Sequence, residues 1–356
     1  LAKTSIKSFT IPRSVSVIDE DVFYECLGID EIKFEKSSEL KIIGRYTFAY
    51  SSIKYITIPD KVISLEERTF TNCKQLISVN FTENSNLIKI DHNCFSNSSI
   101  EELDFPPKLE ILEETWCHHT SQLKQIKISS NNKKFDLIEG KLIVGKSDTD
   151  KNVIYFACRD IEKVIIPSNI TCIKKYAFSN AFKIQSIEFS ENSNLTKIDD
   201  EVFSYSMITK IDIPKSITIL GRRAFNGCEK LNEINFPSDS QLEIISNECF
   251  AETGLTKITI PKTVKKICDK AFFSSLDLNE IIIPEDSELD YFGNDCSVGN
   301  LTSKIFIPKN ITKIDSWFFS NNLQLNEVIF HKDSKIKAFE HGCFSRTNIQ
   351  KIIIPN

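Results

Sequence analysis

Few residues of this chain are spaced as catalytic or metal-binding groups require. Eleven cysteines and five histidines are present, and they gather most densely at Cys117-His118-His119. Zinc needs ligands that converge from several segments in a tetrahedron. Three consecutive residues cannot converge in that way, and no second cysteine or histidine group lies in register with them. We therefore predict a turn on the convex side here, and no metal site.

The sequence also lacks the short motifs of known catalytic sites. It contains no glycine-rich phosphate loop, no nucleophile-elbow serine and no H-E-x-x-H motif. Its acidic residues recur at equivalent positions of a repeat: Asp19-Glu20-Asp21 precedes Phe23, and the same arrangement returns before Phe203. Such acids should face solvent at the start of a turn. We therefore predict that the chain is not an enzyme and binds no cofactor.

A recurring hydrophobic phrase accounts for most of the chain. The phrase Ile-x-Ile-Pro, or a close variant, ends at prolines 47 residues apart, as from Pro12 to Pro59 and from Pro59 to Pro106. Only the step from Pro106 to Pro167 is longer, at 61 residues. A second phrase lies midway, so units of 23 and 24 residues alternate. A fixed period of this length indicates a solenoid, in which each coil buries its apolar face against the next.

Each unit of the repeat combines one strand with one expected helical turn. Phe9 and Ile11 alternate with polar neighbours, which predicts a strand. Phe23 and Cys26 are spaced as in a single helical or 3₁₀ turn. The strands of successive coils should form one long parallel sheet on the concave face. We therefore predict a single α/β-type repeat solenoid over residues 1–356, with short strands and single helical turns.

The long step contains an insertion with its own pattern. Between Ile128 and Ile166, two apolar segments flank the polar stretch 145–151. This arrangement predicts a β-hairpin inserted in the coil 129–165. The hairpin is either a local structural brace or, through its tip, a contact for a partner.

Composition narrows the classes of protein further. Hydrophobic residues make up 41% of the chain, and 44 basic and 49 acidic residues are interspersed to give a net charge of −5. The basic residues are not concentrated in any part of the chain, so the sequence does not indicate a nucleic-acid partner. No apolar run approaches the ~18–20 residues that a membrane span requires. The sequence begins without Met and ends within the repeated phrase, and we interpret it as part of a longer protein.

Most cysteines occupy two columns of the repeat, one three residues after the phenylalanine of the turn and one directly before it. In the second column cysteine serves as a small buried residue. Residues of one column two coils apart are separated by about 10 Å, too far for a disulfide. The best placed pair is Cys94 and Cys117, and a disulfide-dense framework is not predicted. The two columns contain Cys26, Cys73 and Cys228, and Cys94, Cys249, Cys296 and Cys343, respectively.

The repeat resembles the leucine-rich repeats of the BspA-like surface-protein family. The resemblance rests on phrases such as Ile-Pro-Ser-Asn-Ile-Thr-Cys-Ile at 166–173 and Ala-Phe-Asn-Gly-Cys-Glu-Lys-Leu-Asn-Glu-Ile at 224–234, and it covers essentially the whole chain. It implies a curved, right-handed leucine-rich-repeat solenoid. It also implies an adhesion or protein-binding module, on the cell surface or secreted, whose partners include host matrix proteins such as fibronectin and fibrinogen. The alternative is an intracellular, cytoplasmic scaffold that uses the same face.

Strand alternation predicts which side chains lie on the exposed face of the sheet. In the C-terminal half, one outward column becomes apolar at Ile282, Phe306, Ile329 and Ile353, which we call the recognition stripe. We predict that this stripe binds a protein partner. Two alternatives remain, since such residues favour strands in any case or could pack on further coils. A neighbouring column alternates in charge and should form cross-strand pairs; it reads Lys210, Glu233, Lys257, Glu280, Lys304, Glu327 and Lys351.

Overall fold

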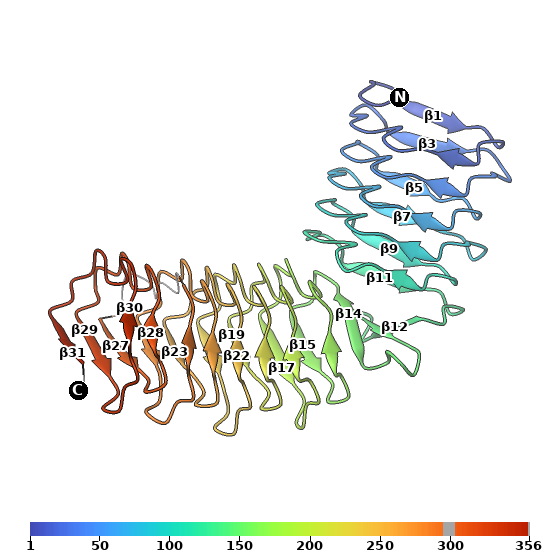
Figure 1. Cartoon of the computed structure of the whole chain (residues 1–356). Coiled ribbons are helices and arrows are strands. Elements are labelled where there is room, and N and C mark those ends of the chain that lie inside the picture. Colours follow the sequence, from blue (N-terminus) through green and yellow to red (C-terminus); the bar gives the residue numbers. More distant parts are fainter. Residues whose placement is uncertain (295–302, 355–356) are drawn as a thin grey trace. The chain divides into compact units, whose positions relative to one another are not determined.

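The computed structural model describes residues 1–294 and 303–354 (Figure 1). These residues form strands and turns, and they contain no helix. The chain divides into two compact units: unit 1 comprises residues 1–161 and 174–181, and unit 2 comprises residues 162–173 and 182–356. We expected one solenoid over the whole chain. The structure presents each unit as a stack of coils, and we describe each by itself.

Unit 1 stacks its coils so that their strands form two parallel sheets (Figure 1). The sheets are in register from coil to coil, so that Phe9 lies beside Ile32 and Ile56 beside Val79. The main sheet comprises β1 (Ser8–Ile11), β3 (Glu31–Phe34), β5 (Tyr55–Thr57), β7 (Ser78–Asn80), β9 (Glu102–Phe105) and β11 (Gln125–Ile128), and the second sheet comprises β2 (Val17–Ile18), β4 (Ile42–Ile43), β6 (Ser64–Leu65), β8 (Lys89–Ile90) and β10 (Ile111–Leu112).

Unit 2 repeats this plan. Its strands again pair in parallel with a one-coil offset, so that Ile211 lies beside Ile234 and Ile305 beside Val328. Its main strands are β15 (Lys163–Ile166), β17 (Ser186–Phe189), β19 (Lys210–Asp212), β21 (Glu233–Asn235), β23 (Lys257–Thr259), β25 (Glu280–Ile282), β27 (Lys304–Ile307), β29 (Glu327–Phe330) and β31 (Lys351–Ile353). Its second row comprises β16 (Cys172–Ile173), β18 (Lys197–Ile198), β20 (Ile219–Leu220), β22 (Ile244–Ile245), β24 (Lys266–Ile267), β26 (Tyr291–Phe292), β28 (Lys313–Ile314) and β30 (Ala338–Phe339).

Alternation along each main strand decides which side chains enter the core. Ile56 and Ile58 are buried, whereas Thr57 between them is exposed. In the same way Ile126 is buried and Lys127 is exposed. Burying one such isoleucine contributes about 1.5–3 kcal/mol, so a shift of one residue in register would be costly in every coil.

The centre of each unit is a stack of phenylalanine rings, one from each coil. In unit 1 the rings of Phe23 and Phe48 lie 5.4 Å apart and 6° from parallel, and in unit 2 those of Phe225 and Phe250 lie 5.4 Å apart and 11° from parallel. All four side chains are fully buried. The unit 1 stack ends edge-on against Trp116, at 89°. These rings hold successive coils at a constant spacing.

The predicted helical turns are replaced by turns of another kind. The residues two positions before and two positions after the buried phenylalanine have positive φ, for example Tyr46 at 55° and Tyr50 at 59° around Phe48. Such residues interrupt a right-handed helix. Alternate amides instead bond to the next coil, as from Phe48 to the carbonyl of Thr69 at 2.9 Å. The predicted helical turns are therefore absent from the described residues, because alternate amides bond to the next coil, while those between them close tight turns within the coil, as from Ala49 to the carbonyl of Tyr46 at 2.9 Å.

The column three residues after each phenylalanine is a row of hydrogen-bond donors. The Cys73 thiol donates to the carbonyl of Phe48 at 3.0 Å, and the Thr120 hydroxyl donates to that of Phe95 at 2.9 Å. Both side chains are buried. In several coils a cysteine, serine or threonine of this column therefore adds a second hydrogen bond to a buried carbonyl of the preceding coil, whereas Ala181 at the same position cannot.

The insertion that lengthens the repeat between Pro106 and Pro167 contains three antiparallel strands. They are β12 (Phe135–Ile138), β13 (Leu142–Gly145) and β14 (Val153–Ala157). β13 pairs with β14 across the polar stretch where the hairpin was expected, and β12 adds a further strand on the other edge of β13. The tip is a compact turn in which the Asp150 carboxylate accepts hydrogen bonds from Ser147 and Tyr155.

A buried arginine lies at the end of this insert. The Arg159 side chain is 3% exposed, and its guanidinium donates to the carbonyls of Thr120, Ala157 and Ala177 at 3.1, 3.2 and 2.9 Å. It also lies 4.2 Å from the ring centre of Phe156. Burial lowers the pKa of Arg159 to about 10. The insert interrupts the regular stacking here. The arginine donates to the Thr120 and Ala157 carbonyls and adds a second donor to that of Ala177, which also accepts from the Ala157 amide at 3.0 Å.

The described cysteines of the two columns are buried as expected, and the best placed pair forms no disulfide. Cys94 and Cys117 are both buried free thiols. Burial raises the pKa of Cys117 to about 12 and holds that of Cys94 well above its ordinary value. Cys296, which the repeat places in the same column as Cys94, lies outside the described residues.

Candidate functional site

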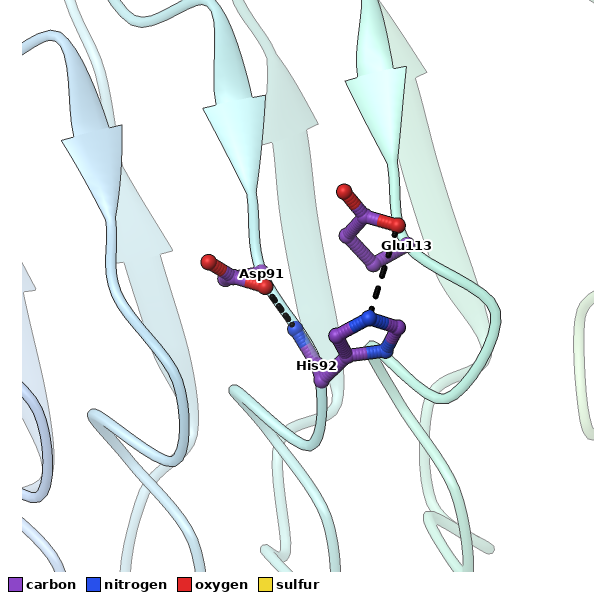
Figure 2. A group of neighbouring side chains, drawn as sticks. All are labelled: Asp91, His92 and Glu113. Atoms are coloured by element: carbon purple, nitrogen blue, oxygen red, sulfur yellow. Dashed lines mark hydrogen bonds and ion pairs between the residues drawn. The ribbon is translucent and has the colours of Figure 1, made fainter.

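Three potential metal ligands lie together on unit 1: Asp91, His92 and Glu113 (Figure 2). Asp91 and His92 follow β8, and Glu113 follows β10 in the next coil. The His92 amide donates to the Asp91 carboxylate at 2.7 Å, and His92 Nε2 lies 3.6 Å from Glu113 Oε2. The sequence prediction missed this group, because its members come from two coils. The sequence separation between His92 and Glu113, about one repeat length, was the signal that could have shown that they lie side by side in adjacent coils.

A lysine already neutralises this group. Lys89 Nζ lies 3.0 Å from Asp91 Oδ2 and 3.1 Å from Glu113 Oε1. The hydrogen bond to Asp91 raises the pKa of Lys89. Burial would raise the pKa of Asp91, but the His92 amide and the Lys89 ammonium together hold it below its usual range. A metal ion would have to displace a protonated lysine, so we interpret the group as an ion-pair network between coils.

The Cys117-His118-His119 segment does not form a metal-ligating group in the described residues. Cys117 is buried, and the rings of His118 and His119 lie 3.8 Å apart. The ring of Tyr176 also packs against His118, with the two ring centres 4.4 Å apart. Burial is the main cause that lowers the pKa of His118, to about 4. The segment is therefore a packed turn in which the His118 imidazole is uncharged near neutral pH.

The residues of the recognition stripe lie on neighbouring strands of unit 2. Phe306, Ile329 and Ile353 are directly paired from β27 through β29 to β31. Ile282 pairs with Thr259 on the other side, in β25, which is the neighbour of β27. Ile353 is 51% exposed, and the other three are half-buried. The structure therefore places Phe306, Ile329 and Ile353 side by side on the sheet β27–β29–β31, with Ile282 in a separate two-stranded sheet whose strand β25 contacts β27.

The charged column beside the stripe forms the cross-strand pairs predicted from the sequence. Lys304 pairs with Glu327 at 3.3 Å, beside Phe306 and Ile329. Further along unit 2 the same column contains the pairs Lys210–Glu233 at 2.7 Å and Lys257–Glu280 at 2.8 Å. These side chains are about half-exposed, so each pair contributes only a few tenths of a kcal/mol. Their effect on the surface is to border the apolar stripe with mixed charge.

A family model described as the BspA type leucine-rich repeat region matches the chain in six copies, over residues 1–124, 151–244 and 243–356. The chain belongs to the BspA-type leucine-rich repeat family. The residues between the first two matches, 125–150, contain β12 and β13. The additional strands are therefore an insertion into an otherwise regular BspA-type array. No curated protein matches the sequence.

Solved structures share the fold of this BspA-type chain. The pneumococcal vaccine antigen PcpA is 20% identical with a TM-score of 0.62, over 97% of this chain and 69% of that one. A leucine-rich cell surface protein from Faecalibacterium prausnitzii is 20% identical with a TM-score of 0.58, over 91% and 79%. A leucine-rich repeat protein from Eubacterium ventriosum is 18% identical with a TM-score of 0.67, over 91% and 84%. At these identities the likeness establishes the fold alone.

The described residues of this BspA-type chain include no helix that could cross a membrane. Their surface is instead made of strand faces and turns, in which polar and apolar columns run from coil to coil. A repeat array of this kind is consistent with a protein-interaction module, because the stacked strands present a continuous, rigid face.

Proposed function

We propose that this chain is a protein-binding module and that the recognition stripe is its contact surface. The direct pairing of Phe306, Ile329 and Ile353 is the main support. It places three large apolar side chains side by side on a rigid sheet, where alternation would allow polar ones. Contiguous exposed apolar residues with a polar border often mark protein-binding surfaces.

The polar part of the same column strengthens this proposal. Asp212 and Asn235 occupy the equivalent positions of β19 and β21, and both are exposed. The fold therefore tolerates polar residues in this column, and packing alone does not require Phe306 or Ile329 there. An aromatic residue at the centre of an apolar stripe is the usual form of a binding hot spot.

The finer function that we propose is attachment of a surface-exposed or secreted protein to a host matrix protein such as fibronectin or fibrinogen. The family membership supports it, as does the description of one structural neighbour as a cell surface protein. The free thiols do not oppose it. Cys73 and Cys228 are fully buried, and burial raises the pKa of each to about 12. Thiols of this kind resist oxidation even in an oxidising environment.

The test replaces the two central residues of the stripe, as Phe306→Ser with Ile329→Ser. We expect binding to immobilised fibronectin or fibrinogen to weaken roughly 30-fold, which corresponds to the ~2 kcal/mol typical of hot-spot residues. Surface plasmon resonance measures the affinity. Circular dichroism and the melting temperature report whether the fold is retained.

The matched control is Asp212→Ser with Asn235→Ser, which changes the same column where it is polar. We expect this control to bind as the original chain does. If neither matrix protein binds, the finer function is wrong. If a bound protein is unaffected by the stripe variant, the stripe is not the contact surface.

A further inference from the structure

A second surface on unit 1 has the chemistry of a ligand site. A groove of about 320 Å³ runs along the turns that follow the second sheet, across four successive coils. Its volume lies at the small end of the range of ~300–1,000 Å³ for ligand pockets. Its lining side chains are all aromatic or polar, and none is aliphatic. They are Tyr46, Tyr50, Arg68, Thr71, Asn72, Asn93, Ser96, Asn97 and His118.

The turn geometry described above creates this groove. Tyr46, Arg68 and Asn93 have positive φ on one side of the phenylalanine column, and Tyr50, Asn72 and Asn97 have positive φ on the other. The two rows of side chains form the walls. The floor between them is made by Thr71 and Ser96, which are buried and joined by a hydrogen bond from the Thr71 hydroxyl to the Ser96 carbonyl at 3.0 Å.

Hydrogen-bonding groups in the groove are left available. Within residues 1–294 and 303–354, the side-chain amides of Asn72 and Asn97 have no hydrogen-bond partner. Each amide offers two donors and one acceptor oxygen. Asn72 and Asn97 occupy the same column in adjacent coils, so their amides lie along one wall. This spacing suits a ligand with several hydroxyl groups, since each hydroxyl both donates and accepts.

One end of the groove is aromatic. The Tyr50 side chain is 43% exposed, and its ring packs edge-on against Tyr24 at 5.5 Å and 67°. Tyr46 stands in the opposite wall, with the Arg68 guanidinium 5.4 Å from its ring centre. A partly exposed tyrosine ring that its neighbour holds in place offers a flat apolar surface beside polar groups. The C–H face of a pyranose ring is complementary to such a surface.

The groove carries little charge. Arg68 is its one charged lining residue, and its guanidinium is already engaged: it donates to the Tyr46 hydroxyl and lies 3.3 Å from Glu67, a carboxylate that also pairs with Arg45. Burial lowers the pKa of His118 to about 4, so its imidazole is uncharged near neutral pH. The corresponding positions of unit 2 differ, because they carry Glu201, Glu248 and Glu252 with positive φ. The neutral amide-lined surface is therefore particular to unit 1 and does not follow from the repeat.

We propose that this groove binds a neutral carbohydrate, with Tyr50 as the stacking platform and Asn72 and Asn97 as the hydroxyl-binding groups. Its size fits a monosaccharide or disaccharide unit at the end or within a longer glycan. The lining contains no carboxylate, so it does not suit a cationic ligand, and its amides and hydroxyls outnumber the single guanidinium, which favours a neutral sugar over an anionic one. The groove lies in unit 1, whereas the recognition stripe lies in unit 2, so the two sites can be tested separately.

The first experiment screens the chain against an array of neutral, sialylated and sulfated glycans, and then titrates the strongest neutral binder by calorimetry. We expect one or more neutral glycans to bind. Asn72→Gly with Asn97→Gly should lower that affinity at least tenfold, because it removes both amides. Glycine adopts positive φ without strain, so the melting temperature should change little. Tyr50→Asn should also lower the affinity at least tenfold while suiting the positive φ of that position.

The matched control is Asn321→Gly, which removes an asparagine from the same repeat position in unit 2, where φ is 63°. It should leave glycan binding unchanged. The proposal is overturned if no neutral glycan binds at roughly 1 mM, the weak end of the useful affinity range, or if only acidic glycans bind. It is also overturned if a neutral glycan binds the Tyr50→Asn variant as tightly as the original chain. This second variant tests the proposal even if the double glycine variant fails to fold.

Discussion

The thiol of Cys73 donates a hydrogen bond to the carbonyl of Phe48, one coil earlier in the chain, at 3.0 Å. Ser275 makes the equivalent bond to Phe250 at 2.6 Å in unit 2. Both donors are fully buried. The relationship changes the meaning of the cysteines in this column: they are selected as donors to a buried carbonyl and not only as small apolar residues.

This relationship predicts different outcomes for two substitutions at Cys73. Cys73→Ser should retain the stability of the chain, because a hydroxyl can donate to the same carbonyl. Cys73→Ala should lower the free energy of unfolding by about 1 kcal/mol, since it removes one of two hydrogen bonds to the Phe48 carbonyl, which keeps that from the Ser51 amide at 3.1 Å. Urea denaturation followed by circular dichroism measures both. Cys94→Ala is the control and should be milder, because other coils use alanine at that position, as at Ala224. Equal losses for the alanine and serine variants of Cys73 would contradict the donor role.

Arg159 should be essential to the stability of unit 1. Arg159→Met keeps the apolar stem but removes the donors to Thr120, Ala157 and Ala177. We expect the free energy of unfolding to fall by roughly 3 kcal/mol, because a buried charged donor to three carbonyls is lost, while that of Ala177 keeps a backbone donor, the Ala157 amide. Denaturant titration monitored by tryptophan fluorescence reports this, since Trp116 packs on Phe156 beneath the arginine. Arg222→Met, at a side chain that is 56% exposed, is the control and should change stability by less than about 0.5 kcal/mol. A variant at Arg159 as stable as the original would show that water replaces its donors.

His118 should make stability depend on pH below neutrality. Burial, with the charges of His119 and Arg159 as smaller causes, lowers its pKa from 6.5 to about 4. The unfolded chain therefore binds a proton at this residue more readily than the folded chain. Its contribution is present above about pH 6.5 and is lost as pH falls toward 4. Allowing for its partial exposure, we expect roughly 1 kcal/mol to be lost at pH 5.

The measurement is the melting temperature of the original chain and of His118→Phe at pH 7, 6 and 5. Phenylalanine preserves a ring against His119 and Tyr176 but cannot be protonated. The melting temperature of the variant should fall less over this interval than that of the original chain. Parallel curves for the two proteins would mean that His118 does not have the lowered pKa.

Much of the fold was predictable because a repeat constrains each residue many times. The alternation around Ile56, Thr57 and Ile58 predicted inside and outside correctly, and the one-coil offset predicted the Lys304–Glu327 pair. The same periodicity placed Phe306 beside Ile329. What it could not predict was backbone conformation in the turns. Tyr46 and Tyr50 are not residues that favour positive φ, and they adopt it because their amides bond to the next coil.

By itself, the sequence determined the period, the parallel in-register stacking and the membership of most apolar residues in a core or surface column. These follow from short-range alternation, which side-chain hydrophobicity encodes directly. The tertiary structure alone decided which polar groups meet across coils: the Cys73 thiol with the Phe48 carbonyl, Lys89 with Asp91 and Glu113, and Asn72 beside Asn97 along one wall of a groove. Such meetings depend on the handedness of each turn and on the spacing of neighbouring coils, and no single repeat unit contains that information.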